Sequence, residues 1–489
     1  MVAITRVDRR ARRRKLSFVY LFVMFGALLV AALVTVKNMT NNILYEKALF
    51  ALHPIPTELP AQTNFLPLVP KTAFTTKNAT AEVESSMLAT PIILKDISSS
   101  TFIQNISSDV TTQEIFEERL THAKQSTQAW AMPPPLETIK SEHSFPTPLP
   151  YPNATLAIRP LYGQHRRNSS EVIFSFARGL GLTKLLPFVK TLWATGYTGD
   201  LVIGISNQPD RELKTFLKFQ TRKYIGLVVY EIPLECINVK LRTHCRTIGM
   251  FESSDGKQKL ADQRNYREMA QLRFEYYWAW ATLYSPEKSK IWLFDARDVF
   301  FQRHPFEDKD ISGCAQTSLH VFEESPRFKI REQRSNRRWI KGGYGDAWYQ
   351  HLASDNVICS GTTFGGQIAI EWYTRAMVHQ FDRTNCTIYG CDQGHHNVLV
   401  RGHLLEGSNK VASIHIHPQG SSVVDTLGLA LENTTLRSLG LLLDNETIVN
   451  FKGRISPIVH QYDRDEEFRG IMLERSQGWL QKLRNKTQT

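Results

Sequence analysis

The stretch IWLFDARDVFFQ, residues 291–302, places two aspartates inside an otherwise apolar run. Its first four residues, 291–294, have the β-branched and aromatic composition of a buried strand, and Asp295 and Asp298 follow them closely. Burying a carboxylate costs free energy unless a partner or a cation compensates its charge. The stretch therefore predicts a strand whose end carries chemistry.

Strands and helices alternate on the N-terminal side of this stretch. Residues 171–179, 200–206 and 226–233 have strand composition, and helical patterns separate them at 182–197 and 209–224. Short connections between such elements are typical of parallel βαβ units, whose sheets are buried on both faces. The fold class predicted is α/β, a mostly parallel sheet flanked by helices, with 291–294 as its fourth strand.

Residues 264–284 predict a long amphipathic helix before that fourth strand. Its apolar face would carry five side chains, Met269, Leu272, Tyr276, Ala279 and Leu283.

The N-terminal region predicts a membrane anchor. Residues 16–36 contain no charge and are long enough to cross a hydrocarbon core as a helix. Seven Lys or Arg and one Asp precede them, so the positive-inside rule places residues 1–15 in the cytosol. The alternative is a cleavable secretory signal, although the apolar run is longer than such signals usually have. Half of the net charge of +12 lies here, and no nucleic-acid-binding signature accompanies the rest.

The remainder of the chain has the composition of a lumenal protein. Residues 37–170 are rich in Ser, Thr and Pro and predict a stem, 171–475 a catalytic domain, and 476–489 a C-terminal tail. All nine N-x-S/T sequons follow the apolar span, at Asn38, Asn78, Asn105, Asn153, Asn168, Asn385, Asn433, Asn445 and Asn485. This layout predicts a type II single-pass protein of the Golgi membrane, with its catalytic domain in the lumen.

Six cysteines, all after residue 230, agree with an oxidising compartment. Cys236 with Cys245 and Cys386 with Cys391 are close enough in sequence to close short loops, but the sequence leaves the pairing open. A cysteine metal site is the other interpretation, and the absence of any C-x-x-C pair disfavours it.

Paired aspartates at a strand end can hold a hard divalent cation, and the cation can hold phosphate oxygens. In an open α/β sheet such ligands bind at the carboxyl ends of the strands. Arg178 after the first strand and Arg273 on the long helix would suit a phosphate-bearing ligand. The basic run at 327–341 would too, although a solvated flexible loop is the plainer interpretation of it. For Arg297 an ion pair with a neighbouring carboxylate is the plainer one.

Several motifs in fixed order complete this picture: DARDVFFQRHPF, RRWIKGGYGDAW, ICSGTTFGG, CDQGHHNVLV, VVDTLG and PIVHQYDR. Over residues 172–470 the chain resembles glycosyltransferases of the GT-A, Rossmann-like fold, which use nucleotide sugars. In those enzymes an acidic motif, commonly D-x-D, coordinates Mn²⁺ on the donor diphosphate. Two residues separate the aspartates here instead of one, which leaves open which of them takes the metal.

The resemblance implies metal ligands and a donor site. Asp298 would ligate Mn²⁺ or Mg²⁺, Asp295 would assist or contact the ribose, and the late His460 would add a ligand. The alternative for His460 is a core histidine with a structural role. Candidate donor-binding residues are Ser175, Arg178, Arg273, Asp295, Ser360 and Gly361.

Two further segments would complete the site. Residues 358–366 have small side chains in what looks like a turn, where a backbone could approach the donor; a structural turn closed by a Cys359 disulfide is the alternative. Asp392 and Gln393 are the candidate catalytic residues, with a helix N-cap as the alternative for Asp392. His395 and His396 fit a structural role.

These features predict a metal-dependent glycosyltransferase that moves sugar from a nucleotide sugar, best a UDP-sugar, to a glycan, protein or lipid acceptor. A non-catalytic carbohydrate-binding scaffold of the same fold is the main alternative, and a lumenal sulfotransferase using Ser360–Thr363 is a weaker one. The sequence excludes neither a monomer nor a homodimer, and it does not reveal the sugar or the acceptor.

Overall fold

The structure, a computed structural model, describes residues 144–239, 242–406 and 408–488. All of them belong to one compact unit, Ile106–Thr489. The predicted cytosolic tail, the apolar span 16–36 and the stem up to residue 143 lie outside the described residues. Within the described ranges, no helix is long and apolar enough to cross a membrane.

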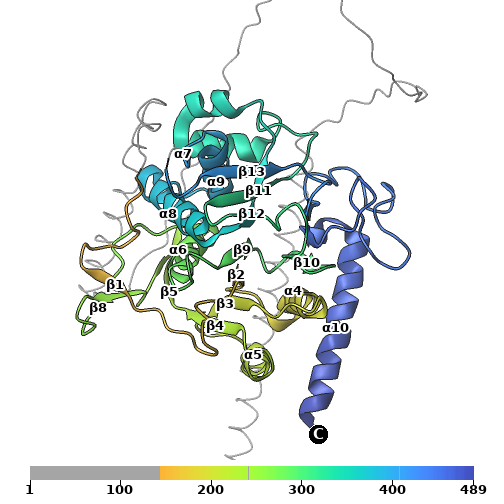
Figure 1. Ribbon diagram of the computed structural model, residues 1–489, viewed down its shortest axis with the longest axis horizontal. Coiled ribbons are helices and arrows are strands. Elements are labelled where there is room, and N and C mark those ends of the chain that lie inside the picture. Colours follow the sequence, from red (N-terminus) through yellow and green to blue (C-terminus); the bar gives the residue numbers. More distant parts are fainter. Residues whose placement is uncertain (1–143, 240–241, 407, 489) are drawn as a thin grey trace, which may run out of the picture. The chain divides into compact units, whose positions relative to one another are not determined.

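A seven-stranded sheet forms the centre of the unit (Figure 1), in the order β13-β11-β12-β9-β2-β3-β4. Six strands run in one direction and β12 is antiparallel to both of its neighbours. The predicted mixed α/β fold with a mostly parallel central sheet is confirmed. The strands are β2 (Glu171–Phe176), β3 (Asp200–Ser206), β4 (Leu227–Ile232), β9 (Lys290–Phe294), β11 (Ser318–Glu323), β12 (Ile358–Gly366) and β13 (Ser413–His417).

Helices cover both faces of the sheet because both faces are apolar. Successive residues of a strand point to opposite faces. Phe174 of β2 accordingly packs in one apolar cluster, with the helices after β4, and its neighbour Ile173 packs in a second cluster with α4 and α5. The helices are α4 (Leu182–Ala194), α5 (Arg211–Lys223), α6 (Met269–Ala281), α7 (Arg334–Leu352), α8 (Gln367–Thr384), α9 (Cys391–Arg401) and α10 (Glu466–Gln488).

Three expectations about local structure are wrong. Helix α6 is not amphipathic, because the sheet and α8 enclose it and every side chain from Gln271 to Ala281 is buried. Residues 358–366 form strand β12 instead of a turn, because both neighbouring strands pair with them. The basic run at 327–341 is helical from residue 334 onward, where α7 begins, so that part of it is not a flexible loop.

Smaller sheets surround the centre. Strand β10 (Val299–Phe301) pairs with β15 (Ile458–His460), and β15 with β14 (Val424–Thr426). Strand β1 (Ala154–Leu156) pairs with β7 (Phe251–Ser253), which also pairs with β8 (Lys259–Leu260). Strands β5 (Leu234–Val239) and β6 (Arg242–Thr247) form a hairpin, and η1 (Tyr462–Arg464) is a single 3₁₀ turn after β15.

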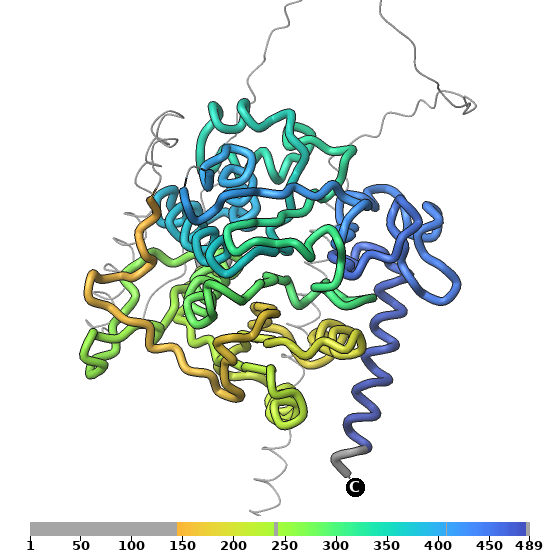
Figure 2. The backbone as a smooth tube through the Cα atoms, in the orientation of Figure 1, coloured from red at the N-terminus to blue at the C-terminus, as the bar shows by residue number. Residues whose placement is uncertain are grey.

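The folded unit extends beyond the expected range 171–475 at both ends. Figure 2 shows the chain from residue 144 running along the rest of the unit before it enters β2. Phe145 is buried there and its ring packs on that of Trp372. At the other end, α10 continues through residue 475, and its Trp479 packs on the apolar cluster around α4.

The two short cysteine loops anticipated in the sequence are both closed. Cys236 is bonded to Cys245 across the β5–β6 hairpin, and Cys386 to Cys391 at the start of α9. Cys314 and Cys359 are buried free thiols, so no disulfide closes the segment around Cys359.

Candidate functional site

Three elements bring together two aspartates and a histidine. Asp295 follows the carboxyl end of β9, Asp298 immediately precedes β10, and His460 is the last residue of β15. Strand β10 pairs antiparallel with β15, and Val299 lies opposite His460. This register places residues about 160 positions apart in the chain side by side.

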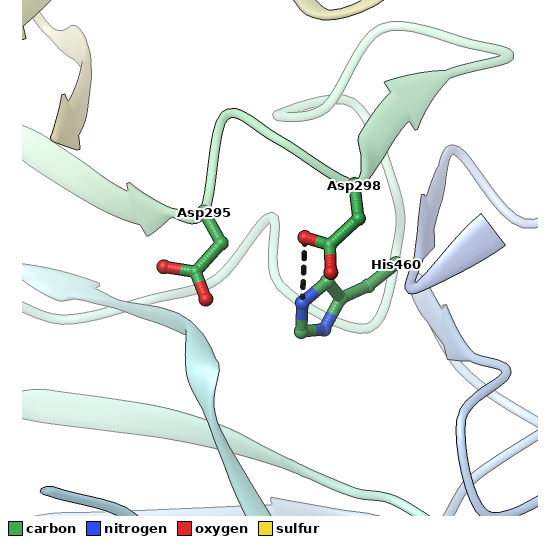
Figure 3. A group of neighbouring side chains, drawn as sticks. All are labelled: Asp295, Asp298 and His460. Atoms are coloured by element: carbon green, nitrogen blue, oxygen red, sulfur yellow. Dashed lines mark ion pairs between the residues drawn. The ribbon is translucent and has the colours of Figure 1, made fainter. Parts of the chain in front are cut away.

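The potential ligand atoms of Asp295, Asp298 and His460 all lie within 4.8 Å of one another. Figure 3 shows the two carboxylates and the imidazole ring gathered below the 295–298 turn. Nε2 of His460 is 3.6 Å from Oδ1 of Asp298, and both side chains are buried, whereas Asp295 is partly exposed. Within the described ranges it is the one group of three or more such residues close enough to hold a metal ion.

The surroundings of Asp298 favour its ionised, carboxylate form. Burial by itself raises the pKa of Asp298, but His460 and Arg297 outweigh burial and lower this pKa well below its usual value. Nη2 of Arg297 donates to Oδ2 of Asp298 at 2.8 Å, so the ion pair expected for Arg297 is confirmed. The site therefore presents a buried carboxylate that is ionised at neutral pH.

The donor set fits a divalent transition metal. Oδ1 of Asp298 is buried, and its ion-pair partner among the described residues, Nε2 of His460, lies 3.6 Å away, beyond hydrogen-bond distance. A buried carboxylate oxygen held this loosely is what a cation would satisfy. Nδ1 of His460 is 3.7 Å from Sγ of Cys359, which leaves Nε2 facing the carboxylates. Two carboxylates and one imidazole are ligands that Mn²⁺ accepts.

Gly361 of β12 leaves the space for this arrangement. A Cβ atom on it would lie 2.5 Å from Cε1 of His460 and 2.9 Å from Oδ2 of Asp295. Its carbonyl also accepts a hydrogen bond from the backbone N–H of Asp295 at 3.0 Å. The pairing of β12 with β11 shifts register at this point, so residues 360–362 bulge out of that pairing.

Arg273 of α6 joins the cluster to the start of α9. Its buried guanidinium forms an ion pair with Asp295, and Nη2 donates to Oδ2 of Asp392 at 2.8 Å. The Ser360 hydroxyl donates to the same Asp392 oxygen at 2.9 Å. Helix α9 begins at Cys391 with Gly390 as its N-cap, so the alternative role of Asp392 as an N-cap is wrong.

Ser175 and Arg178 form hydrogen bonds with the ends of neighbouring strands. The hydroxyl of Ser175 is fully buried and donates to the carbonyl of Phe294 at 2.8 Å, which links β2 to β9. Arg178 lies beyond β2, and its Nε donates to the carbonyl of Ile232 at the end of β4, 3.3 Å away. Both are at the carboxyl edge of the sheet, on the side of β2 to β4.

Gln393 contacts Glu324, a buried residue that was not among the candidates from the sequence. Its Nε2 donates to Oδ1 of Asn336 at 3.2 Å, and it also hydrogen-bonds Glu324, a buried carboxyl just beyond β11. Glu324 contacts Cys359 and Gln461 as well, and burial raises its pKa. An apolar run followed by Glu323 and Glu324 is the same signal as the run that ends at Asp295, and it could have been used.

His395 and His396 have structural surroundings. Nδ1 and Nε2 of His395 contact the carbonyl of Cys391 and the hydroxyl of Thr384, and Nδ1 of His396 contacts the Tyr373 hydroxyl. Burial lowers the pKa of His395 to about 4 and that of His396 to about 3, so both are neutral.

The sulfotransferase alternative loses its main support in the structure. Residues 360–363 lie within β12, and a phosphosulfate-binding loop would instead have to lie between a strand and a helix.

No family model and no curated protein matches the chain. The solved structures that it resembles include glycosyltransferases. The galactosyltransferase LgtC in complex with donor and acceptor sugar analogues is 11% identical over 64% of this chain and 95% of its own, with a TM-score of 0.34. The apo structure of the bifunctional glycosyltransferase WbbM is 9% identical over 62% of this chain and 47% of its own, with a TM-score of 0.35.

Proposed function

We propose that the chain is a metal-dependent glycosyltransferase of the GT-A type, which transfers sugar from a nucleotide sugar, best a UDP-sugar, to an acceptor hydroxyl. The observation that carries this proposal is the Asp295–Asp298–His460 cluster at the carboxyl edge of a mostly parallel sheet. Its buried Asp298 oxygen has no hydrogen-bond donor in range among the described residues. Ligands of α/β sheets bind at this edge.

Asp298 and His460 would hold Mn²⁺ or Mg²⁺, with Asp295 as a third ligand or a contact to the ribose. The bound cation would offset the charge of the diphosphate that leaves the sugar. Transfer breaks the bond between the anomeric carbon and a diphosphate oxygen, forms a bond to the acceptor oxygen, and releases the proton of the acceptor hydroxyl.

The protein groups around the cluster would orient the donor. Arg178 would bind the nucleotide on the side of β2 to β4. Arg273 holds Asp295 and Asp392 in fixed positions, and Ser360 and Gly361 border the space beside Asp295. Asp392 and Gln393, in the first turn of α9, would contact the transferred sugar, with Asp392 as the candidate for accepting the proton.

The location of this enzyme belongs to the proposal as well. Anchored by residues 16–36, the domain would act in the Golgi lumen on a glycan, glycoprotein or glycolipid. The six sequon asparagines within the described ranges are all exposed, which suits attachment of glycans in that compartment: Asn153, Asn168, Asn385, Asn433, Asn445 and Asn485.

A donor screen tests the proposal. Purified full-length protein in detergent would be incubated with each common nucleotide sugar, with Mn²⁺ or with EDTA, and release of the nucleoside diphosphate measured. We expect one donor to be turned over with Mn²⁺ and not with EDTA. Absence of turnover for every donor, together with absence of metal-dependent nucleotide binding, would leave the carbohydrate-binding scaffold as the better description.

A further inference from the structure

A hollow of about 130 Å³ lies among the segments that follow β11, β13 and β14. It is lined by Ser325, Pro326, Arg327, Gln419, Ala430 and Phe451. At about 30 Å³ per water molecule, its volume corresponds to about four waters, which suits part of a sugar ring better than a whole nucleotide sugar.

The hollow and Arg178, the residue proposed to bind the nucleotide, lie on opposite sides of β9 in the sheet order. Ser325 follows Glu324, which contacts Gln393 and lies beyond β11. Gln419 donates to Asp425 of β14, the strand beside β15, and Thr426 of β14 lies opposite His460. Strands β11 and β12 lie on one side of β9 in the sheet order, and β2 to β4 lie on the other.

Gln419, which lines the hollow, has a side-chain oxygen without a hydrogen-bond donor among the described residues. Its side chain is buried, and Nε2 donates to Oδ1 of Asp425 at 2.8 Å and to the carbonyl of Thr426 at 3.3 Å. These two bonds fix the amide, while its Oε1 receives no hydrogen bond from any residue that the structure describes. A buried carbonyl oxygen without a donor is favourable for a ligand hydroxyl.

Phe451 supplies an apolar wall. It is 47% exposed, and its ring covers Gly420, where a Cβ atom would lie 2.3 Å from Cδ2 of the ring. Oδ1 of Asn450 accepts from the backbone N–H groups of Lys452 and Arg454 at 3.0 and 3.1 Å. This tight turn holds the ring in place, and an exposed aromatic ring beside hydrogen-bonding groups suits the apolar face of a sugar.

Arg327 makes the hollow cationic. It is exposed, and no acidic side chain in the described part of the chain forms an ion pair with it. Asp425, behind Gln419, carries only part of a negative charge at neutral pH because burial raises its pKa to about 7. A guanidinium matches a carboxylate in shape and can bind both of its oxygens.

We propose that this hollow binds an acidic sugar of the acceptor, with Arg327 on its carboxylate, Oε1 of Gln419 accepting a hydroxyl, and Phe451 against the ring. The assignment of this sugar to the acceptor rests on the proposed function. Binding of an acidic sugar to the hollow can be measured whether or not that function is correct. The acceptor would then approach the Asp295–Asp298–His460 cluster from the β11 side, and the nucleotide from the side of β2 to β4.

Saturation-transfer NMR on the full-length protein tests the proposal with two probes, methyl β-glucuronide and the neutral methyl β-glucoside. We expect clear transfer to the glucuronide and at least fivefold weaker transfer to the glucoside. Arg327→Ala and Phe451→Ala should each reduce the glucuronide signal at least fivefold. Arg334→Ala, which removes an exposed arginine of the same basic run outside the hollow, should leave it unchanged.

Three results would overturn the proposal: no transfer to the glucuronide, equal transfer to both probes, or a signal that survives Arg327→Ala. Displacement of the glucuronide by UDP with Mn²⁺ would assign the hollow to the donor and overturn it too. Binding of UDP with Mn²⁺, measured on the same wild-type sample, tests the proposed function separately. A protein that binds UDP but not the glucuronide would refute only the acidic-sugar site, and the converse would refute only the enzyme.

Discussion

Gly361 is the residue that most directly limits what the site can hold, because any side chain there would enter the space between Asp295 and His460. All three atoms that a Cβ atom would meet belong to side chains, so an added methyl group would displace the candidate ligands and leave the backbone of β12 in place. A substitution at Gly361 is therefore expected to affect metal binding more than folding.

Replacement of Gly361 by alanine should lower the affinity for Mn²⁺ at least about tenfold, the range found when the surroundings of metal ligands are altered. Gly313→Ala is the matched control, since a Cβ atom at Gly313 would meet nothing within 4 Å. Isothermal titration with Mn²⁺ on both variants measures the effect. Equal affinities in the two variants would show that the metal, if bound, lies elsewhere.

At the scale of single elements, the disulfide at the start of α9 is expected to support function more than the one in the β5–β6 hairpin. Cys391 directly precedes Asp392 and Gln393 and is bonded to Cys386. The pair Cys236 and Cys245 closes the hairpin. By loop length, each bond should stabilise the fold by a similar amount, about 2 to 3 kcal/mol.

The double variant Cys386→Ser with Cys391→Ser should therefore weaken binding of UDP with Mn²⁺ several-fold more than Cys236→Ser with Cys245→Ser, at similar losses of thermal stability. Fluorescence titration with UDP and thermal unfolding measure the two effects. If both pairs weaken UDP binding equally, α9 does not depend on its disulfide for positioning the site.

The pairing of β11 with β13 should make the fold sensitive to acid. Nδ1 of His320 on β11 is 2.9 Å from Nε2 of His417 on β13, and burial, followed by the charges of His417 and His415, lowers the pKa of His320 to about 3. The folded-state pKa is below that of the unfolded chain, near 6.5, so the unfolded chain binds the proton first as pH falls. Stability from this group is present above pH 6.5 and is lost between pH 6.5 and about 3.

His320→Phe should remove about 2 kcal/mol of the stability loss between pH 7 and pH 5, the amount expected for one buried neutral histidine with this shift. Urea unfolding followed by tryptophan fluorescence at the two pH values measures the difference, with the exposed His351→Gln as control. An unchanged pH dependence in His320→Phe would mean that folding does not lower the pKa of His320.

The elements also show what could be predicted from the sequence. Strands β2, β3, β4 and β9 were predictable because each is a short β-branched and aromatic run between turn residues, and α4 and α5 because their apolar residues recur at helical spacing. Strand β12 was not, because its small residues Ser360 and Gly361 are typical of turns. Pairing on both sides, a tertiary effect, outweighs that local preference.

The site was predictable to a similar extent. Asp295 and Asp298 could be found from local sequence, and the resemblance to glycosyltransferases pointed to His460. The ion pairs of Arg273 with Asp295 and Asp392 and the position of Glu324 depend on contacts between distant segments. No periodicity in a single sequence encodes such contacts.

At the scale of the whole molecule, the proposed topology places every sequon in the lumen. The six within the described ranges are exposed, so their modification requires no unfolding. Expression in a eukaryotic host should yield a protein whose mobility on a gel increases after treatment with peptide-N-glycosidase. Asn433→Gln should remove one step of the shift. A chain without any shift would contradict the lumenal orientation.

For the whole molecule, the proposed function depends on a catalytic metal held by Asp298 at the sheet edge. Calorimetric titration of Mn²⁺ in the presence of UDP measures this binding in wild-type protein, Asp298→Asn and the exposed control Asp310→Asn. We expect one Mn²⁺ site in the wild type and in Asp310→Asn, and at least about a hundredfold weaker binding in Asp298→Asn with an unchanged circular dichroism spectrum. Undiminished Mn²⁺ affinity in Asp298→Asn would contradict this role of Asp298.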